Sequence, residues 1–148
     1  TLQENGGEFF PEVNLLNVND ICKTEAVYGT MERLSDYTIN NKIYSKVIKH
    51  SFLTNDGYNS KLYFKIKNFK RYDELILKVY SEKLDETEGN IMQVLNPNNG
   101  DVIDSYILKE DYTKDYNIDI EGLKDVWVYI SISPNSDINI LKMVAKNN

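Results

Sequence analysis

The sequence predicts an all-β protein, an antiparallel two-sheet β-sandwich of jelly-roll type, and three observations support this prediction. Short runs that alternate apolar and polar residues recur along the chain, as at residues 61–68 and 126–133. Turn-forming residues separate the runs, as at Asn98-Asn99-Gly100. No segment keeps a 3.6-residue apolar period over the roughly ten residues that a globular helix needs. We therefore expect about eight or nine short strands and almost no helix.

The chain is expected to form one folded domain preceded by a short extension. Residues 1–12 contain a Gly-Gly pair and a proline with little apolar periodicity, which is typical of a linker or a lightly docked arm. Residues 13–148 then form a single β-sandwich domain, since a chain of 148 residues has the usual size of one domain. Within it, the β runs of residues 13–27 are weak, and the polar segment 29–36 interrupts the strand pattern.

A hairpin is the first well-marked element. Asn40 and Asn41 lie between the β-prone residues 37–39 and 43–48. Asparagine tolerates the left-handed backbone that a tight two-residue turn requires, so this pair is expected to form the turn. Residues 53–60 follow as a loop rich in Asn, Asp, Gly and Ser, long enough to project from the edge of the sheet.

The rest of the domain is a regular succession of strands. In residues 61–68, Leu62, Phe64 and Ile66 point to one face and the residues between them to the other, which is typical of a half-buried strand. The alternation of the last strand slips at Ile140, as a β-bulge would make it do. The remaining expected strands are residues 74–81, 90–95, 101–108, 116–120, 126–133 and 138–145.

Composition excludes several classes of partner. The net charge is −6 and the pI is about 4.8, and the lysines are scattered instead of forming a basic stripe, so we expect no nucleic-acid partner. The longest apolar runs, such as residues 126–130, are too short to cross a bilayer, so we expect no membrane insertion. The sequence shows neither a signal peptide nor an initiating methionine, which is typical of a piece of a larger, multidomain chain.

No reaction centre can be assembled from the residues. The single histidine, His50, would have to serve every serine, and neither a G-x-S-x-G sequence nor a glycine-rich phosphate loop occurs. The single cysteine, Cys22, is interpreted as a small buried residue, and the carboxylates of residues 85–88 as a solvated acidic loop. We therefore expect a protein that is not an enzyme and holds no cofactor. A structural calcium ion at residues 85–90 is the alternative to a metal-free chain.

Three segments resemble the NPCBM-type carbohydrate-binding modules of bacterial secreted and cell-surface proteins. INNKIYSKVIKHS resembles their i-G-x-x-Y-x-K-G-i-x-x-H-A segment, KLYFKIKNFKRYDELILKVY resembles a second segment, and the stretch from Asn90 to Ile132 resembles a third. The resemblance spans residues 15–144 and implies a divergent β-sandwich member of that family. Two features depart from it: the chain lacks the glycine of the family's K-G-i, and His50 falls one position before the family's histidine.

The expected ligand site lies at one end of the sandwich, where loops meet. Sugar rings present apolar faces, so a binding site places a tyrosine or tryptophan beneath the ring and hydrogen-bonding side chains around it. Tyr58 or Trp127 would stack on the sugar. His50, Asn55 and Asp56 would bond to its hydroxyls. The full expected ligand-binding set is His50, Ser51, Asn55, Asp56, Tyr58, Glu82, Lys83 and Trp127.

The face on which Trp127 lies has two interpretations. Trp127 and Tyr129 point away from Val126 and Val128 of the same strand, and Tyr80 points away from the core residues of its own strand. If the two strands were neighbours, these rings would form an aromatic patch on one sheet. The alternative is that the other sheet, the N-terminal arm or a partner covers this face.

Together with the resemblance, these patterns predict a non-catalytic carbohydrate-binding or adhesion-like module of a secreted or cell-surface bacterial protein. Its partner, a glycan or a protein, is expected at the loop end. The main alternative is a protein-interaction or structural spacer module that has lost the sugar site, which would fit the departures from the family. A third interpretation is an accessory domain that positions a neighbouring catalytic domain.

Overall fold

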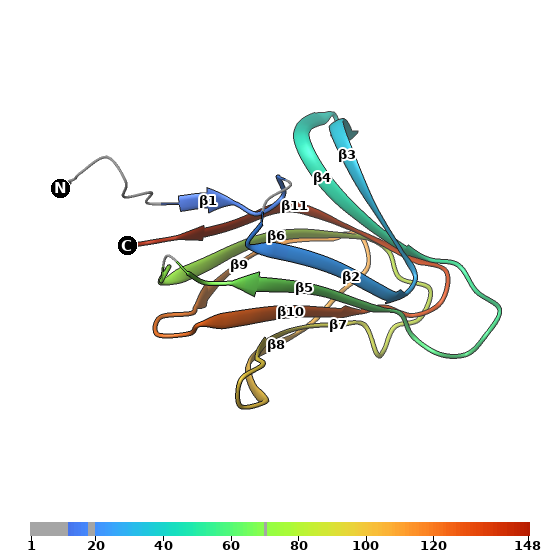
Figure 1. The fold of residues 1–148 in the computed structure, drawn as a ribbon. Helices are drawn as coiled ribbons and strands as arrows, with labels where there is room; N and C mark the ends of the chain where they lie inside the picture. Colours follow the sequence, from blue (N-terminus) through green and yellow to red (C-terminus); the bar gives the residue numbers. More distant parts are fainter. Residues whose placement is uncertain (1–11, 18–19, 70) are drawn as a thin grey trace.

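The chain forms two antiparallel sheets that pack face to face, as Figure 1 shows. The computed structural model describes residues 12–17, 20–69 and 71–148. Within these residues there are eleven strands and no helix, so none of the described elements is a helix that could span a bilayer. The predicted all-β sandwich is confirmed. The predicted linker over residues 1–12 falls outside the described residues except for Glu12, which belongs to the first strand.

The strands divide into a six-stranded and a five-stranded sheet. Sheet A has the order β3-β4-β11-β6-β9, with β1 also paired to β11, and sheet B has the order β2-β5-β10-β7-β8. The strands of sheet A are β1 (Glu12–Asn14), β3 (Thr30–Ile39), β4 (Lys42–Phe52), β6 (Glu74–Lys83), β9 (Tyr112–Asp119) and β11 (Ser136–Lys146). The strands of sheet B are β2 (Cys22–Tyr28), β5 (Lys61–Lys67), β7 (Ile91–Asn96), β8 (Asp101–Ile107) and β10 (Asp125–Ser131).

The core lies between the sheets and follows the predicted alternation. Leu62, Phe64 and Ile66 of β5 are at most 2% exposed, and Leu75 and Leu77 of β6 face them from sheet A, fully buried. Burial of each such side chain contributes roughly 1.5–3 kcal/mol. The intervening residues of β5 and β6 point to the outer faces, so each sheet has one buried face and one outer face.

Two local predictions about backbone geometry are confirmed. Asn40 and Asn41 have φ values of 49° and 67°, the left-handed geometry of a two-residue hairpin turn between β3 and β4. Strand β11 has a register shift against β6 between Ile140 and Lys142, where the sequence predicts a bulge, and a second shift, not predicted, between Asp137 and Asn139.

The prediction for residues 29–36 is wrong, because β3 begins at Thr30 and runs through this polar segment. Strand β3 is an edge strand of sheet A and pairs only with β4, and most of its side chains are exposed. An edge strand that buries little has no need of alternating apolar residues, so the pattern that marks the inner strands is missing here. The strand number exceeds the expected eight or nine because the weak β runs of residues 13–27 also form strands, β1 and β2.

The hairpin of β3 and β4 also covers part of the outer face of sheet A. Figure 1 shows it rising from the layer of this sheet. Ile39 at its tip packs with Leu141 of β11 and Tyr80 of β6 in a second apolar cluster, in which all three side chains are at most 9% exposed. Tyr80 does point away from the main core, but the hairpin buries it.

Candidate ligand-binding site

His50 lies in the protein interior and does not face solvent. Its side chain is fully buried, with Nδ1 2.8 Å from the carbonyl oxygen of Thr30 and Nε2 2.9 Å from Oγ of Ser60. A carbonyl oxygen can only accept, so Nδ1 carries the proton, and Nε2 of the neutral ring accepts from the Ser60 hydroxyl. Burial lowers the pKa of His50, which keeps the ring neutral.

The Ser60 hydroxyl connects His50 to the opposite sheet. Oγ of Ser60 accepts a hydrogen bond of 3.0 Å from the backbone N–H of Ile132, which follows β10. His50 belongs to β4 of sheet A, so this chain of bonds joins the two sheets at the loop end. With both ring nitrogens engaged and no exposed surface, His50 acts as a structural residue in this arrangement.

Three other predicted residues lie on the outer face of sheet A. The Ser51 hydroxyl donates to the Asp137 carboxylate, and Lys83 lies opposite Asp137 on the other side of β11. Glu82 accepts a hydrogen bond of 3.0 Å from the side-chain amide of Asn139. Asp137 and Asn139 are alternate residues of β11, so Ser51 and Glu82 both bond to polar groups of the sheet surface itself.

The predicted loop residues project at the end of the sandwich. Asn55 and Asp56 are exposed, and Tyr58, which is 44% exposed, packs with its ring centroid 5.6 Å from that of Phe52 and 4.8 Å from that of Tyr28. The amide of Asn59 donates to the carbonyl oxygen of Gly89 at 2.7 Å, which ties this loop to the acidic loop of residues 84–90.

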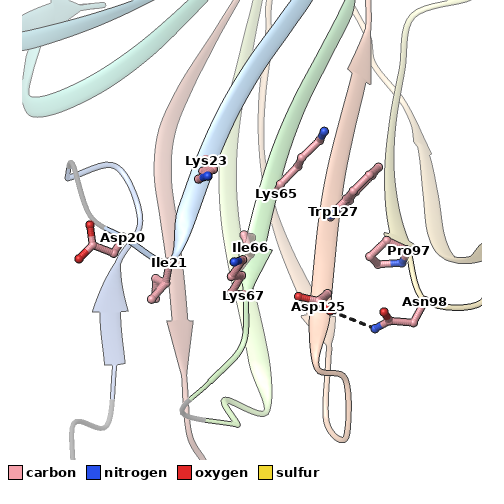
Figure 2. Close-up of a pocket in the computed structure, with 10 residues that line it drawn as sticks. All are labelled: Asp20, Ile21, Lys23, Lys65, Ile66, Lys67, Pro97, Asn98, Asp125 and Trp127. Atoms are coloured by element: carbon pink, nitrogen blue, oxygen red, sulfur yellow. Dashed lines mark hydrogen bonds between the residues drawn. The ribbon is translucent and has the colours of Figure 1, made fainter.

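Trp127 lies away from this loop, in a depression on the outer face of sheet B. In β10 it pairs with Lys65, near the last residue of β5, whereas the loop of residues 53–60 precedes the first residue of β5. Figure 2 shows Trp127 between Lys65 and Pro97, which follows β7. The depression has a volume of about 400 Å³ and is lined by Asp20, Ile21, Lys23, Lys65, Ile66, Lys67, Pro97, Asn98, Asp125 and Trp127.

Neighbouring side chains hold the indole of Trp127 in place. The Lys65 ammonium lies 4.5 Å from the ring centroid, and its position is fixed by an ion pair of 2.6 Å with Glu25 on β2. The ring of Tyr63 contacts the indole edge to face, with a centroid separation of 5.9 Å. The indole is half-buried, and its remaining surface lines the depression.

The polar groups of the depression suit hydroxyl ligands. Lys23 and Lys67 supply ammonium donors from β2 and β5, and Asp20 supplies a carboxylate acceptor. The Asn98 side-chain amide donates to the Asp125 carboxylate at 3.1 Å, the bond drawn as a dashed line in Figure 2. An apolar ring surrounded by a few donors and acceptors is the usual composition of a small-molecule site.

The sequence identifies one of these lining residues and misses the rest. Trp127 stands out because it is the single tryptophan and points away from the core of its strand. Lys23, Lys65 and Asn98 come from three other segments, and only the pairing of β2 with β5, of β5 with β10 and of β10 with β7 brings them together. The proposed neighbourhood of Tyr80 and Trp127 is wrong, because β6 and β10 belong to different sheets.

The groups with the strongest intrinsic reactivity lie outside the depression. His50 is enclosed as described, and burial raises the pKa of the Cys22 thiol to about 11, so the thiolate is scarce at neutral pH. Among the described residues no three His, Cys, Asp or Glu side chains gather in a way that could hold a metal ion. In the acidic loop, the amide of Asn90 already donates to the carbonyl oxygen of Glu86.

The fold is similar to that of carbohydrate-binding modules and adhesin domains. A structure of the CBM51-2 and INT domains of Clostridium perfringens ZmpB matches with a TM-score of 0.61 and 13% identity, over 92% of this chain and 31% of that one. A cleaved adhesin domain of Lys-gingipain from Porphyromonas gingivalis matches with a TM-score of 0.62 and 11% identity, over 93% and 97%. CBM51 from Clostridium perfringens GH95, in complex with methyl-galactose, matches with a TM-score of 0.56 and 11% identity, over 91% and 99%.

These similarities establish the fold and leave the family open. No protein-family model matches the sequence, and no curated protein matches it. The chain spans about a third of the length of the ZmpB structure. The resemblance to NPCBM-type modules is therefore supported at the coarser level of a fold shared with carbohydrate-binding modules and adhesin domains, and not as membership of that family.

Proposed function

We propose that the chain is a non-catalytic module that binds a glycan in the depression around Trp127. The observation that carries this proposal is the half-buried indole, held by Lys65 and Tyr63 and bordered by ammonium, carboxylate and amide groups. An apolar ring presents a surface to the C–H face of a sugar, and the polar groups around it reach the hydroxyls. The similarity in fold to carbohydrate-binding modules adds support.

The absence of catalysis is part of the same proposal. Glycoside hydrolysis uses a pair of carboxylates, one as acid and one as base or nucleophile, and the described lining of the depression contains two, Asp20 and Asp125. Asp125 is engaged with Asn98. A module that recognises glycans fits a secreted or cell-surface protein, which is the location we propose.

Trp127 provides a direct test, because it is the only tryptophan and its fluorescence reports on this site alone. A glycan array should first identify a binding sugar, with galactose and N-acetylglucosamine among the glycans displayed. Titration with that sugar should then shift the emission of Trp127, and Trp127→Ala should weaken binding at least about tenfold, which corresponds to about 1.4 kcal/mol.

Two matched variants locate the site. Tyr112→Ala removes an aromatic side chain that is 51% exposed on β9 of the other sheet, and should leave affinity unchanged. Tyr58→Ala tests the loop end by itself. If no glycan is enriched at high protein concentration, or if Trp127→Ala binds as well as the unaltered protein, the proposal is wrong.

A protein partner is the second candidate function. Val102 and Ile107 on β8 are 52% and 73% exposed on the same sheet, and exposed apolar groups of this size are common at protein interfaces. Two results together would favour this function over the first: a glycan array that shows no enrichment, and binding to a protein partner that is lost on Ile107→Lys.

A further inference from the structure

The aromatic rings on the outer face of sheet B form a continuous series. Tyr63 of β5 contacts Trp127 with a centroid separation of 5.9 Å, and it contacts Tyr129 with a separation of 4.9 Å. Trp127 and Tyr129 are alternate residues of β10, and the register places Tyr129 directly opposite Tyr63, so all three lie on one face. Each of the three is half-buried, which leaves part of each ring open to solvent.

This series continues to the loop end. Lys61 lies two residues before Tyr63 on the same face of β5, and its ammonium is 5.9 Å from the ring centroid of Tyr28. The rings of Tyr28 and Tyr58 are 4.8 Å apart, and the two side chains are 42% and 44% exposed. We call this set the aromatic strip: Trp127, Tyr63, Tyr129, Tyr28 and Tyr58.

The strip is too long for a single sugar. Lys65 lies beside Trp127 at one end and Lys61 beside Tyr28 at the other, and four residues of strand span roughly 13 Å at about 3.3 Å per residue. A six-membered ring built from bonds of about 1.5 Å is about 3 Å across, and about 6 Å across with a hydroxyl oxygen on each side, which is still less than half the length of the strip. A monosaccharide in the depression around Trp127 would leave the rings of Tyr28 and Tyr58 uncovered.

Polar side chains are interleaved with the rings along the strip. Glu25 lies opposite Tyr63 on β2, and Gln93 lies opposite Tyr129 on β7. Around the depression the three lysines Lys23, Lys65 and Lys67 are matched in number by the carboxylates of Asp20, Glu25 and Asp125, so this part of the strip carries no excess of positive charge that would select a polyanion. Alternation of apolar rings with hydrogen-bonding groups matches a polymer whose units each present an apolar face and hydroxyl edges.

We propose that the ligand of this module is an extended glycan chain that runs along the outer face of β5, from the depression at Trp127 to Tyr58 at the loop end. This inference rests on the proposed function. It joins the two residues that the sequence nominates for stacking, Tyr58 and Trp127, as the opposite ends of one binding surface. The glycan is bound along its length, so the protein recognises internal segments of a polysaccharide and not only its terminal sugar.

Chain length is the variable that tests the inference. The probes are the mono-, tri- and hexasaccharides of mannose, galactose, glucose and N-acetylglucosamine, titrated while the indole N–H signal of Trp127 is followed by nuclear magnetic resonance. Within a series that binds, affinity should rise at least about tenfold from one sugar to six. Tyr58→Ala should remove the gain between the tri- and hexasaccharide. Trp127→Ala lacks the indole reporter and is measured by isothermal titration calorimetry, where it should weaken binding at least about tenfold at every length. Tyr112→Ala, the control on the other sheet, should change nothing.

The outcomes separate this inference from the proposed function. Binding that depends on Trp127 but has the same affinity for one sugar and for six would overturn the inference and leave the proposed function in place. If the protein bound none of the probes and none of the arrayed glycans, both the inference and the proposed function would be wrong. A second copy of the protein is the other molecule that could occupy the strip, and sedimentation of the unaltered protein and the two variants tests for it. A dimer that dissociates on both Trp127→Ala and Tyr58→Ala would assign the strip to that second copy and overturn the inference.

Discussion

Gly29 tests whether His50 is a fixed structural residue. A Cβ atom added to Gly29 would lie 2.7 Å from Cε1 of His50 and 3.0 Å from the carbonyl oxygen of Ser51. The His50 ring cannot easily move away, because Thr30 and Ser60 hold both of its nitrogens. Gly29 also has a φ of +93°, which side chains other than glycine rarely adopt. Alanine at this position therefore meets both a steric clash and backbone strain.

The two costs can be estimated separately. A non-glycine residue in such a backbone conformation costs roughly 1–3 kcal/mol, and overpacking against a rigid neighbour costs roughly another 1–3 kcal/mol. We therefore expect Gly29→Ala to lower the free energy of unfolding by about 4 kcal/mol. For a chain of this length, that lowers the melting temperature by about 8–16 °C.

Two other glycines serve as matched controls. Gly100 has a φ of +80° and no atom within 4 Å of an added Cβ, so Gly100→Ala should cost only the backbone strain, about 1–3 kcal/mol. Gly57 also has open space and no positive φ, so Gly57→Ala should change the free energy of unfolding by less than about 0.5 kcal/mol. The ranking Gly29, Gly100, Gly57 is the prediction, and it does not depend on the absolute values.

Urea unfolding followed by Trp127 fluorescence, with melting curves from circular dichroism, measures all three variants. If Gly29→Ala costs no more than Gly100→Ala, the His50 ring moves aside freely, and the bonds to Thr30 and Ser60 do not fix it. The role of His50 as a fixed structural residue that links the two sheets would then be refuted, and a role in ligand binding would have to be considered again.

Three further predictions follow from the same structure. The folded state keeps His50 neutral with a lowered pKa, so the unfolded chain binds a proton at this residue first as the pH falls below about 6.5. The free energy of unfolding should therefore fall with acidification by up to about 1.4 kcal/mol per pH unit from this group. Equal slopes of the free energy of unfolding against pH for the unaltered protein and His50→Gln would contradict this. Burial of Cys22 and its raised pKa of about 11 should make the thiol resist iodoacetamide at pH 8 in the folded protein and react promptly in urea, as mass spectrometry can show. Residue 41 has a φ of 67° in the hairpin turn, so Asn41→Gly should raise the free energy of unfolding by about 0.5 kcal/mol and Asn41→Val should lower it by more than about 1 kcal/mol. If urea unfolding gave the opposite order of stability, the turn would have another geometry.

Sequence analysis finds the strands that bury one face and expose the other. Strand β5 alternates fully buried and outward residues, so its period of two is visible in the sequence. The turn at Asn40 and Asn41 is equally visible, because only a few residue types tolerate positive φ. Residues 30–36 of strand β3 escape detection because they bury little of either face, and the sequence of an exposed edge strand resembles that of a loop.

The site is harder to predict because it depends on pairing. The outward direction of Trp127 can be inferred from its own strand, but its neighbours Lys65 and Lys23 follow only from the register of β10 on β5 and of β5 on β2. Local alternation does not specify which strands pair, since many orders satisfy the same pattern. The enclosed position of His50 is hidden for a similar reason, because its partners Thr30 and Ser60 come from separate segments and are themselves polar.

The two outer faces of the sandwich treat their aromatic residues differently, and the difference bears on function. On sheet A the hairpin of β3 and β4 folds back over Tyr80 and Leu141 and buries both to at most 8% exposure. On sheet B no described strand covers Trp127, Tyr63 or Tyr129, which remain half-buried. Full burial of an aromatic side chain stabilises a fold by roughly 1.5–3 kcal/mol, so folding alone would favour covering these rings as well. Tyr37 and Tyr44 of the hairpin are half-buried against the cluster on sheet A, so the difference between the faces is that the rings of sheet B lie on an uncovered sheet, and it is this surface that the proposed glycan would contact.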